Sequence, residues 1–401
     1  MKNINEYLRI GTGYYRETIT PMTSDEIKVL KLWNRQTLID DFGKDALSKI
    51  EKYSGFCFIP SHKNFKKVIS NHYNRYEPLT YPINNQGNWS TIEQFLEHIF
   101  GEQYDIGLDY LTILWNYPTQ ILPIFCLVSE ERNTGKTTFL NLLKIIFEGN
   151  MTLNTNEDFR SRFNSDWAGK LIIAIDEVLL EKREDSERIK NLSTSKYYKA
   201  EAKGKDKVES EFFGKFILCS NNEDSFIKID SNETRYWIRK IPSLGDKVNP
   251  TLLNDLKREV PAFANFLNNR NVVSKKVSRM WFSKEQIYTA ALDVLLFGNR
   301  TSIEKELEEM LKDEFVVFEV EKLCYTTKNL VEMLKRRGFV ASSHYIASIL
   351  KSKYNLESEK NSSYKYYRSD IYHESNSIEN GFTNEKGRYY SFERANFGNL
   401  L

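Results

Sequence analysis

Glycine, lysine and threonine follow one another at Gly135-Lys136-Thr137, a combination of residues that suits a phosphate group. An apolar run at 121–128 precedes them across a polar loop, and a helix-like apolar periodicity follows at 139–147. Strand, loop and helix in this order are the context that a phosphate-binding loop requires. Backbone N–H groups at the helix start attract the phosphate, Lys136 neutralises its charge, and the Thr137 hydroxyl is a ligand for Mg²⁺. The predicted nucleotide-binding residues are Asn133, Thr134, Gly135, Lys136, Thr137 and Thr138.

One position departs from the pattern G-x-x-x-x-G-K-[ST] of such loops. Where the first glycine belongs, the chain has Glu130. The departure leaves the conformation at the start of the loop open, but it does not touch the lysine and threonine that do most of the chemistry. The alternative interpretation is a lysine in an ordinary loop, and the strand and helix around it argue against that alternative.

A pair of carboxylates, Asp176-Glu177, ends a second apolar stretch at 170–178 (KLIIAIDEV). We expect Asp176 to hold a metal ion directly or through water, and Glu177 to polarise an attacking water molecule. A solvated strand end is the alternative. The position downstream of Lys136, at the end of a second buried strand, disfavours it.

Two further polar residues are candidates for the same site. Asn221 lies at the tip of a third apolar stretch, 215–222 (KFILCSNN), where an amide can orient water or contact a γ-phosphate. Arg235 lies in the segment TRYWIRK, and a cation there can reach the nucleotide of a neighbouring subunit as an arginine finger. The alternative for this segment is a solvated surface, which is the usual place of a basic stretch.

The order of these motifs resembles that of the superfamily three helicases, a viral and plasmid branch of the ring-forming AAA+ ATPases. Residues 95–270 look most like the helicase part of the poxvirus-type primase-helicases of phages and mobile elements. The matching phrases are PTQILPIFCLVSEERNTGKTTF, NTNEDFRSRFNSDWAGKLIIAIDE and FFGKFILCSNN…ETRYWIRKIP. The resemblance assigns Lys136 and Thr137 to Walker A, Asp176 and Glu177 to Walker B, Asn221 to the sensor position and Arg235 to the arginine finger, with Arg239 as a less certain finger.

The resemblance implies an ATP hydrolase that uses ATP and Mg²⁺. It implies a homo-oligomeric ring, hexameric in the family, that moves on single-stranded DNA and unwinds a fork during replication of a phage, plasmid or other mobile element in a bacterial cytoplasm. The alternative is a replication initiator that binds origin duplex DNA and uses ATP for assembly. A P-loop module that binds nucleotide and signals without DNA is a third class. Residues 1–90 are too few for a primase domain, so the resemblance implies that the primase half is absent or is a separate chain.

The highly charged segment 180–214 contains a predicted β-hairpin over 199–208. Helicases of the resembling family carry a hairpin at this position that enters the central pore and grips the DNA backbone. A lysine at the tip is a point charge for a phosphate and suits tracking without sequence preference. Lys205 is the first candidate for this contact and Lys203 the second, with a solvated turn as the alternative.

The composition is that of a globular protein of two or three domains: 401 residues, 40% hydrophobic and 28% charged. A net charge of +2 offers no general argument for binding nucleic acid. Four cysteines without a CxxC motif and five unclustered histidines predict neither a disulfide framework nor a zinc site, which suits a reducing cytoplasm. The longest apolar run is about eight residues, too short to span a membrane, and the N-terminus carries no signal peptide.

The predicted fold class is α/β, in four parts. They are a small N-terminal α+β region with a linker (1–90), an AAA+ ATPase domain with a helical collar (91–270), a winged helix (278–370) and a tail (371–401) that is partly disordered or adds a strand to a neighbour. Within the collar, two amphipathic helices are expected to break at Gly101 and near Gly107.

Two basic segments are candidates for contact with nucleic acid. Residues 63–76 combine basic and aromatic side chains that can stack on single strands, although aromatics of a small core are the more economical interpretation. Residues 326–368 hold nine Lys/Arg against three Asp/Glu, a net charge of +6 that leaves −4 for the rest of the chain. A winged helix used for protein contacts is the alternative for the second segment.

Overall fold

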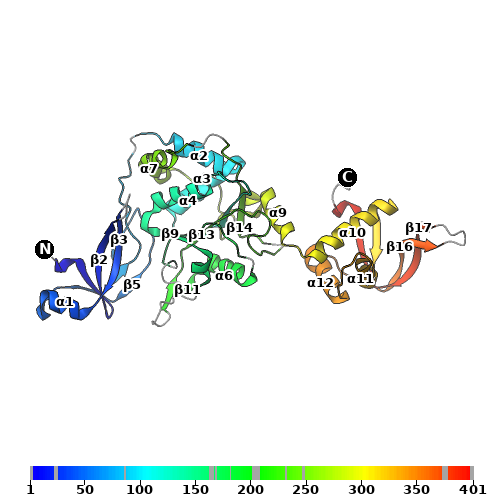
Figure 1. Ribbon diagram of the computed structural model, residues 1–401, viewed down its shortest axis with the longest axis horizontal. Helices are drawn as coiled ribbons and strands as arrows, with labels where there is room; N and C mark the ends of the chain where they lie inside the picture. The colour runs from blue at the N-terminus through cyan, green and yellow to red at the C-terminus, as the bar shows by residue number, and fades with distance from the viewer. Residues whose placement is uncertain are drawn as a thin grey trace. The chain divides into compact units, whose positions relative to one another are not determined.

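The computed structural model describes residues 3–21, 26–84, 87–161, 167, 169–180, 182–200, 208–230, 233–245, 249–372 and 378–397. The chain divides into two compact units, residues 1–296 and 297–401 (Figure 1). Both units mix helices with strands, so the expected α/β character is confirmed. Within the described residues, no helix combines the length and the apolar character needed to cross a membrane.

A five-stranded parallel sheet forms the centre of the first unit. Its strands, in spatial order, are β14 (Tyr236–Lys240), β8 (Ile124–Val128), β13 (Lys215–Ser220), β10 (Ile172–Ile175) and β9 (Met151–Asn154). Every neighbouring pair is parallel, and β8, β10 and β13 are buried along their whole length, as expected when both faces are covered. All carboxyl ends therefore meet at one edge, and the three predicted apolar strands are confirmed.

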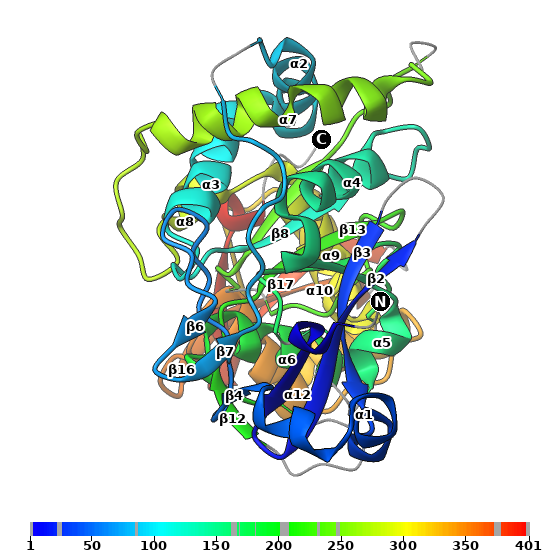
Figure 2. The ribbon, with the colours of Figure 1, turned by 90° about the vertical axis from the view of Figure 1, so that its left-hand side faces the viewer.

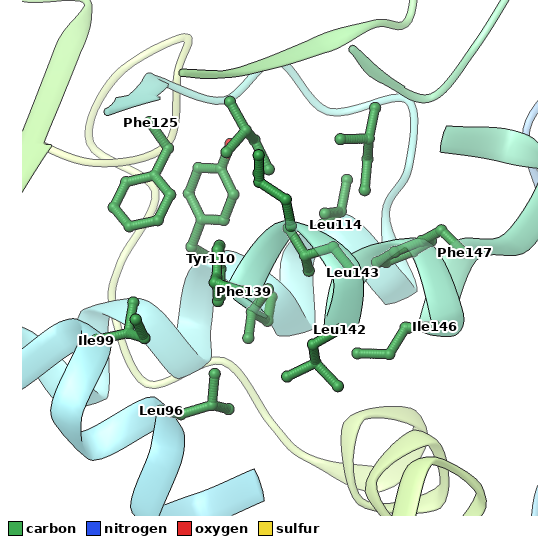
Figure 3. Packing of buried hydrophobic residues seen from close by; sticks show 14 of the residues in the cluster. Leu96, Ile99, Tyr110, Leu114, Phe125, Phe139, Leu142, Leu143, Ile146 and Phe147 are labelled. Atoms are coloured by element: carbon green, nitrogen blue, oxygen red, sulfur yellow. The ribbon is translucent and has the colours of Figure 1, made fainter. Parts of the chain in front are cut away.

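Helices cover both faces of this sheet. On one face lie α2 (Ser90–Phe100), α3 (Tyr104–Asn116), α4 (Lys136–Phe147) and α7 (Leu252–Asn269); α6 (Arg183–Thr194) and α9 (Ala290–Gly298) lie on the other (Figure 2). The apolar residues of α4 recur at helical spacing and pack between the sheet and the helices beside it. Figure 3 shows Phe139 and Leu143 of α4 close to Phe125 of β8 and Tyr110 of α3.

The predicted helix break near Gly107 is wrong, whereas the break at Gly101 is confirmed. Gly101 has φ +48° and ends α2, but Gly107 lies inside α3. A Cβ atom on Gly107 would lie only 2.2 Å from the Phe100 ring. The glycine therefore serves the close packing of α2 on α3 and does not interrupt the helix.

The described part of the N-terminal region forms two small sheets and one α-helix. A four-stranded sheet has the order β3 (Glu26–Trp33), β2 (Gly13–Pro21), β1 (Tyr7–Ile10), β4 (Glu51–Tyr53), followed by a sheet of β5 (Gly55–Cys57), β7 (His72–Asn74) and β6 (Val68–Ile69); the helix is α1 (Arg35–Phe42). Tyr73 and Tyr76 are 5% and 0% exposed. These aromatics are core residues, so they are not free to stack on a nucleic acid.

The strands of the predicted hairpin are present beyond α6. β11 (Tyr197–Ala200) pairs antiparallel with β12 (Val208–Glu211), with Ala200 opposite Val208. The tip, including Lys203 and Lys205, lies outside the described residues. Its predicted contact with DNA therefore stays a prediction.

The second unit has its own apolar core. Its elements are α10 (Ser302–Phe318), β15 (Lys322–Tyr325), α11 (Thr327–Arg336), α12 (Ser343–Tyr354), β16 (Ser362–Tyr372), β17 (Ile378–Gly387) and β18 (Tyr390–Glu393). The helices predicted around 302, 327 and 342 are confirmed. The prediction that 371–401 is a tail is wrong for β17 and β18. Within this unit β17 pairs with β16, and β18 pairs with β15.

The division between the units falls at 296–297, later than the boundary predicted near 271–278. The short helix α8 (Lys284–Ile287) and the following α9 pack on the first unit. The Thr289 hydroxyl donates to the Ile238 carbonyl of β14, and Leu292 and Leu295 join the core under the sheet. This packing keeps residues 278–296 with the first unit.

Candidate functional site

The loop that joins β8 to α4 needs a left-handed backbone at two positions. Asn133 has φ +55° and Gly135 has φ +90°. A Cβ atom on Gly135 would lie 3.0 Å from the Phe95 ring of α2, so glycine fits this position on two counts. Glu130 has no positive φ, which means that its backbone does not require the glycine of the usual pattern.

The loop is braced at its start and in its middle by residues far along the chain. The Glu130 N–H donates to Glu223 Oε1 at 3.1 Å, and Lys240 Nζ donates to Glu223 Oε2 at 2.8 Å. The Leu244 N–H donates to the Asn133 carbonyl at 3.0 Å. Glu223 is only 7% exposed, so its carboxylate is a fixed acceptor that holds the loop entrance. The sequence motifs gave no indication of this residue.

Lys136 begins α4 and folds back over the loop. Its Nζ donates to the Ser129 carbonyl at 3.1 Å and to Thr134 Oγ1 at 3.2 Å, and the residue is 7% exposed. Burial lowers the pKa of this ammonium, while the charges of Asp176 and Glu223 act in the opposite direction. Both of these acceptors are neutral. A phosphate placed in the loop would be an anionic partner for the ammonium and would form a stronger, charge-assisted hydrogen bond.

Thr137 and Asp176 meet although 39 residues separate them. Thr137 Oγ1 donates to Asp176 Oδ2 at 2.9 Å, from the first turn of α4 to the residue directly after β10. A hydroxyl and a carboxylate oxygen are the hard ligands that Mg²⁺ prefers. These two side chains therefore fit a magnesium ion placed beside the loop.

Glu177 and Asn221 complete the same edge of the sheet. Glu177 is exposed, has φ +52°, and its carbonyl accepts from Asn156 Nδ2 at 3.1 Å. Asn221 is exposed and follows β13, the strand between β8 and β10. The next residue, Asn222, closes a turn by accepting from the Ser225 N–H at 2.7 Å, and this turn carries Glu223. The structure thus brings the predicted residues from 133–138, 176–177 and 221 to one edge.

Arg235 lies at the opposite edge of the sheet. Its carbonyl accepts from the Ile124 N–H at 2.8 Å, at the amino end of β8. The loop leaves β8 five residues later, about 16 Å away at the usual rise per residue. Arg239 is 5% exposed and pairs with Glu102 of the same chain. Of the two arginines, Arg235 is therefore the one that can reach outward, and it does not reach its own loop.

The chain matches a family model over 127–239, from β8 to β14; the family is described as "Family of unknown function (DUF5906)". The fold of this chain is similar to that of the NrS-1 C terminal region (305-718) in the apo form. That match has a TM-score of 0.65 and 16% identity, over 96% of this chain and 95% of the other. An A form apo structure of this region matches with a TM-score of 0.61 and 16% identity, over 88% of this chain and 92% of the other. Another A form apo structure matches with a TM-score of 0.63 and 15% identity, over 96% of this chain and 95% of the other. No curated protein matches the chain.

At 15–16% identity these likenesses establish the fold and leave the chemistry to the residues themselves. The similarity extends over nearly the whole of both chains. The second unit is therefore part of the shared fold.

Proposed function

We propose that this chain is an ATPase of the P-loop, AAA+ type that drives a ring along single-stranded DNA in the replication of a mobile element. The observation on which the proposal rests is the meeting of Lys136, Thr137 and Asp176 where the loop leaves β8. A buried lysine, a helix-start hydroxyl and a strand-end carboxylate together form the set that a nucleoside triphosphate with Mg²⁺ requires.

ATP is the proposed substrate of this edge. The N–H groups at the start of α4 and around Gly135 bind the phosphates, and Lys136 neutralises the β- and γ-phosphate charge. Thr137 and Asp176 would hold Mg²⁺, which neutralises charge that develops on the phosphate oxygens. The chain's own residues then fix the triphosphate in place for attack.

Hydrolysis follows from the two exposed side chains beside the loop. Glu177 and Asn221 orient a water molecule whose oxygen attacks the γ-phosphorus. The bond from this phosphorus to the β,γ-bridging oxygen breaks, and ADP leaves with the bonding electron pair. The products are ADP, inorganic phosphate and a proton released to solvent.

The position of Arg235 supports the proposed ring. An arginine finger must reach the γ-phosphate, and Arg235 lies at the far edge of the sheet from its own loop. In a head-to-tail ring, that edge of one subunit faces the loop edge of the next. The family resemblance implies that the ring has six subunits.

DNA contact is assigned to two parts of the chain. The segment between β11 and β12 contains Lys203 and Lys205, the proposed contacts for the backbone of a single strand. In the second unit, α10, α11 and α12 with the β16–β17 hairpin follow the order of a winged helix, and 326–368 has a net charge of +6. That local charge also favours the second candidate function, a replication initiator whose ATP drives assembly on origin duplex DNA.

ATP hydrolysis with and without single-stranded DNA tests the proposal, with the mass of the assembly determined under the same conditions. We expect hydrolysis that DNA stimulates, together with a ring that ATP promotes. A monomer whose hydrolysis is indifferent to DNA would contradict the helicase function. No hydrolysis under any of these conditions would contradict the nucleotide site itself.

A further inference from the structure

The amino edge of the sheet contains a cavity that the proposed ATP site does not use. It has a volume of about 300 Å³, within the size range of small-ligand sites. Three stretches of chain line it: Pro123 just before β8, residues 234–235 just before β14, and residues 278–287 just before and within α8. Its polar lining residues are Thr234, Arg235, Ser278, Arg279, Ser283 and Lys284.

The cavity is positively charged. Arg279 and Lys284 are exposed, and no carboxylate of the described residues lies within ion-pair distance of either. The third cation, Arg235, pairs with Glu233, and Glu233 Oε2 also lies 3.5 Å from the buried Lys190 Nζ. Lys190 also pairs with Glu187 and Asp230, so Glu233 balances Arg235, and the net positive charge of the cavity lining comes from Arg279 and Lys284.

The backbone holds Arg279 in a fixed place. The Val277 N–H donates to the Trp281 carbonyl at 2.8 Å, and the Trp281 N–H donates back to Ser278 at 3.1 Å. Met280 and Phe282, one and three residues beyond Arg279, are 6% and 3% exposed. A short closed turn with buried anchors fixes the backbone of Arg279, so that binding has to order only its side chain.

The chain's own nucleotide cannot be the ligand, because the loop leaves the other end of β8, about 16 Å away. We propose that this cavity is the second half of an ATP site formed between subunits, in which Arg279 and Lys284 bind the γ-phosphate of the neighbour's ATP beside Arg235. The proposal rests on the proposed function and assigns two further residues and a second chain segment to it. A triphosphate carries the charge that three converging cations recognise.

Mixed assemblies of the full-length chain test the proposal through ATP hydrolysis. Lys136→Ala keeps the cavity and loses its own phosphate loop, whereas Arg279→Ala/Lys284→Ala keeps the loop and loses two cations of the cavity. We expect each variant alone to turn over ATP at least about tenfold more slowly than wild type, since neither contains a complete interface. An equal mixture recovers activity, because about one interface in four then joins an intact loop to an intact cavity.

Lys275→Ala is the matched control, since it removes an exposed cation of the same segment that does not line the cavity. It should keep wild-type turnover. Wild-type turnover by Arg279→Ala/Lys284→Ala would overturn the proposal, and so would the absence of recovery in mixtures that assemble normally.

The exchange Arg279→Lys/Lys284→Arg separates charge from folding. It keeps both cations and should retain most of the turnover; a loss as deep as that of the alanine pair would show a structural role and overturn the proposal. Wild-type protein is measured first, because an absence of hydrolysis there contradicts the proposed function, whereas the outcomes above contradict only the role of the cavity.

Discussion

Glu130 replaces the first glycine of the usual loop pattern, and the loop does not need a glycine there. Glu130 has no positive φ, and its N–H is held by Glu223 at 3.1 Å. Glu130→Gly should therefore keep ATP affinity within about threefold of wild type, and lower stability by about 0.5–1 kcal/mol through the freer unfolded chain. Titration with a fluorescent ATP analogue and chemical denaturation measure the two effects.

Gly135→Ala is the contrasting substitution in the same loop. An alanine at φ +90° costs about 1–2 kcal/mol, and its Cβ atom meets the Phe95 ring at 3.0 Å. ATP affinity should fall by roughly tenfold or more. Equal affinities for the two variants would show that the loop does not bind the phosphates.

Sequence motifs reveal those site residues whose roles depend on neighbouring positions in the chain. Lys136 and Thr137 are found because their roles depend on adjacent positions in one loop, and Asp176 because it ends an apolar strand. Glu223 was missed because it acts on Glu130 from 93 residues away. Only the turn closed by Asn222 brings its carboxylate inward, and no local pattern records that geometry.

At the scale of the elements, β13 begins with a lysine that the site does not use. Lys215 is 4% exposed, and its ammonium donates to the carbonyls of Pro118 and Phe213. Burial lowers the pKa of Lys215 from 10.5 to about 7. Between these values the unfolded chain binds a proton that the folded chain does not, so this lysine makes stability rise with pH from about 7 towards 10.5.

Lys215→Met should remove that rise. Relative to the variant, wild-type protein should gain about 2 kcal/mol of unfolding free energy between pH 7 and pH 9. Denaturation followed by tryptophan fluorescence reports on this unit alone, because all six tryptophans precede residue 297. A difference between the two proteins that stays constant with pH would mean that Lys215 is charged in the folded state.

The hairpin of β11 and β12 is the element assigned to DNA. Lys205→Ala should leave basal ATP hydrolysis unchanged and slow strand displacement on a forked duplex at least about fivefold, because a phosphate contact is lost at each step. Lys196→Ala, at the base of the hairpin beside Tyr197, is the control and should displace strands at the wild-type rate. Strand displacement at the wild-type rate would contradict this role, and a collapse of basal hydrolysis in Lys205→Ala would show that the hairpin is structural.

Elements were predictable where burial imposes a pattern on the sequence. The central strands are apolar along their length and were found as such. The sequence of β17 (Ile378–Gly387), IENGFTNEKG, does not predict a strand, because pairing with β16 and not apolar alternation defines it. Gly107 predicts a helix break by its residue type alone, but its actual role depends on the Phe100 ring of another helix.

At the scale of the whole molecule, positive charge is concentrated in one segment and not in one unit, since residues 297–401 as a whole hold 16 Lys/Arg and 16 Asp/Glu. The overall net charge is only +2, but 326–368 contributes +6. The boundary itself was misplaced, because residues 278–296 carry no signal that they pack on β14. A buried threonine and two leucines decide that packing, and any globular domain contains such residues.

Residues 297–401 should fold alone, since their apolar core draws only on their own side chains. We expect the fragment to bind duplex DNA with an affinity that falls linearly on a logarithmic salt scale, with a slope of about −3 to −5 for a handful of phosphate contacts. Lys351→Ala, which removes an exposed cation of α12, should reduce that slope by about one. Lys322→Ala, whose ammonium pairs with Glu393 at 3.4 Å on β18, is the control and should leave the slope unchanged.

The same titration distinguishes the two candidate functions. Equal affinity for unrelated duplexes favours a helicase whose second unit holds DNA without reading it, because phosphate contacts carry no sequence information. Preference for one sequence by about a thousandfold or more favours an initiator, because only contacts to base edges or to DNA shape give that ratio. A folded fragment that binds no DNA at low salt would contradict both, and would make this unit a surface for protein contacts.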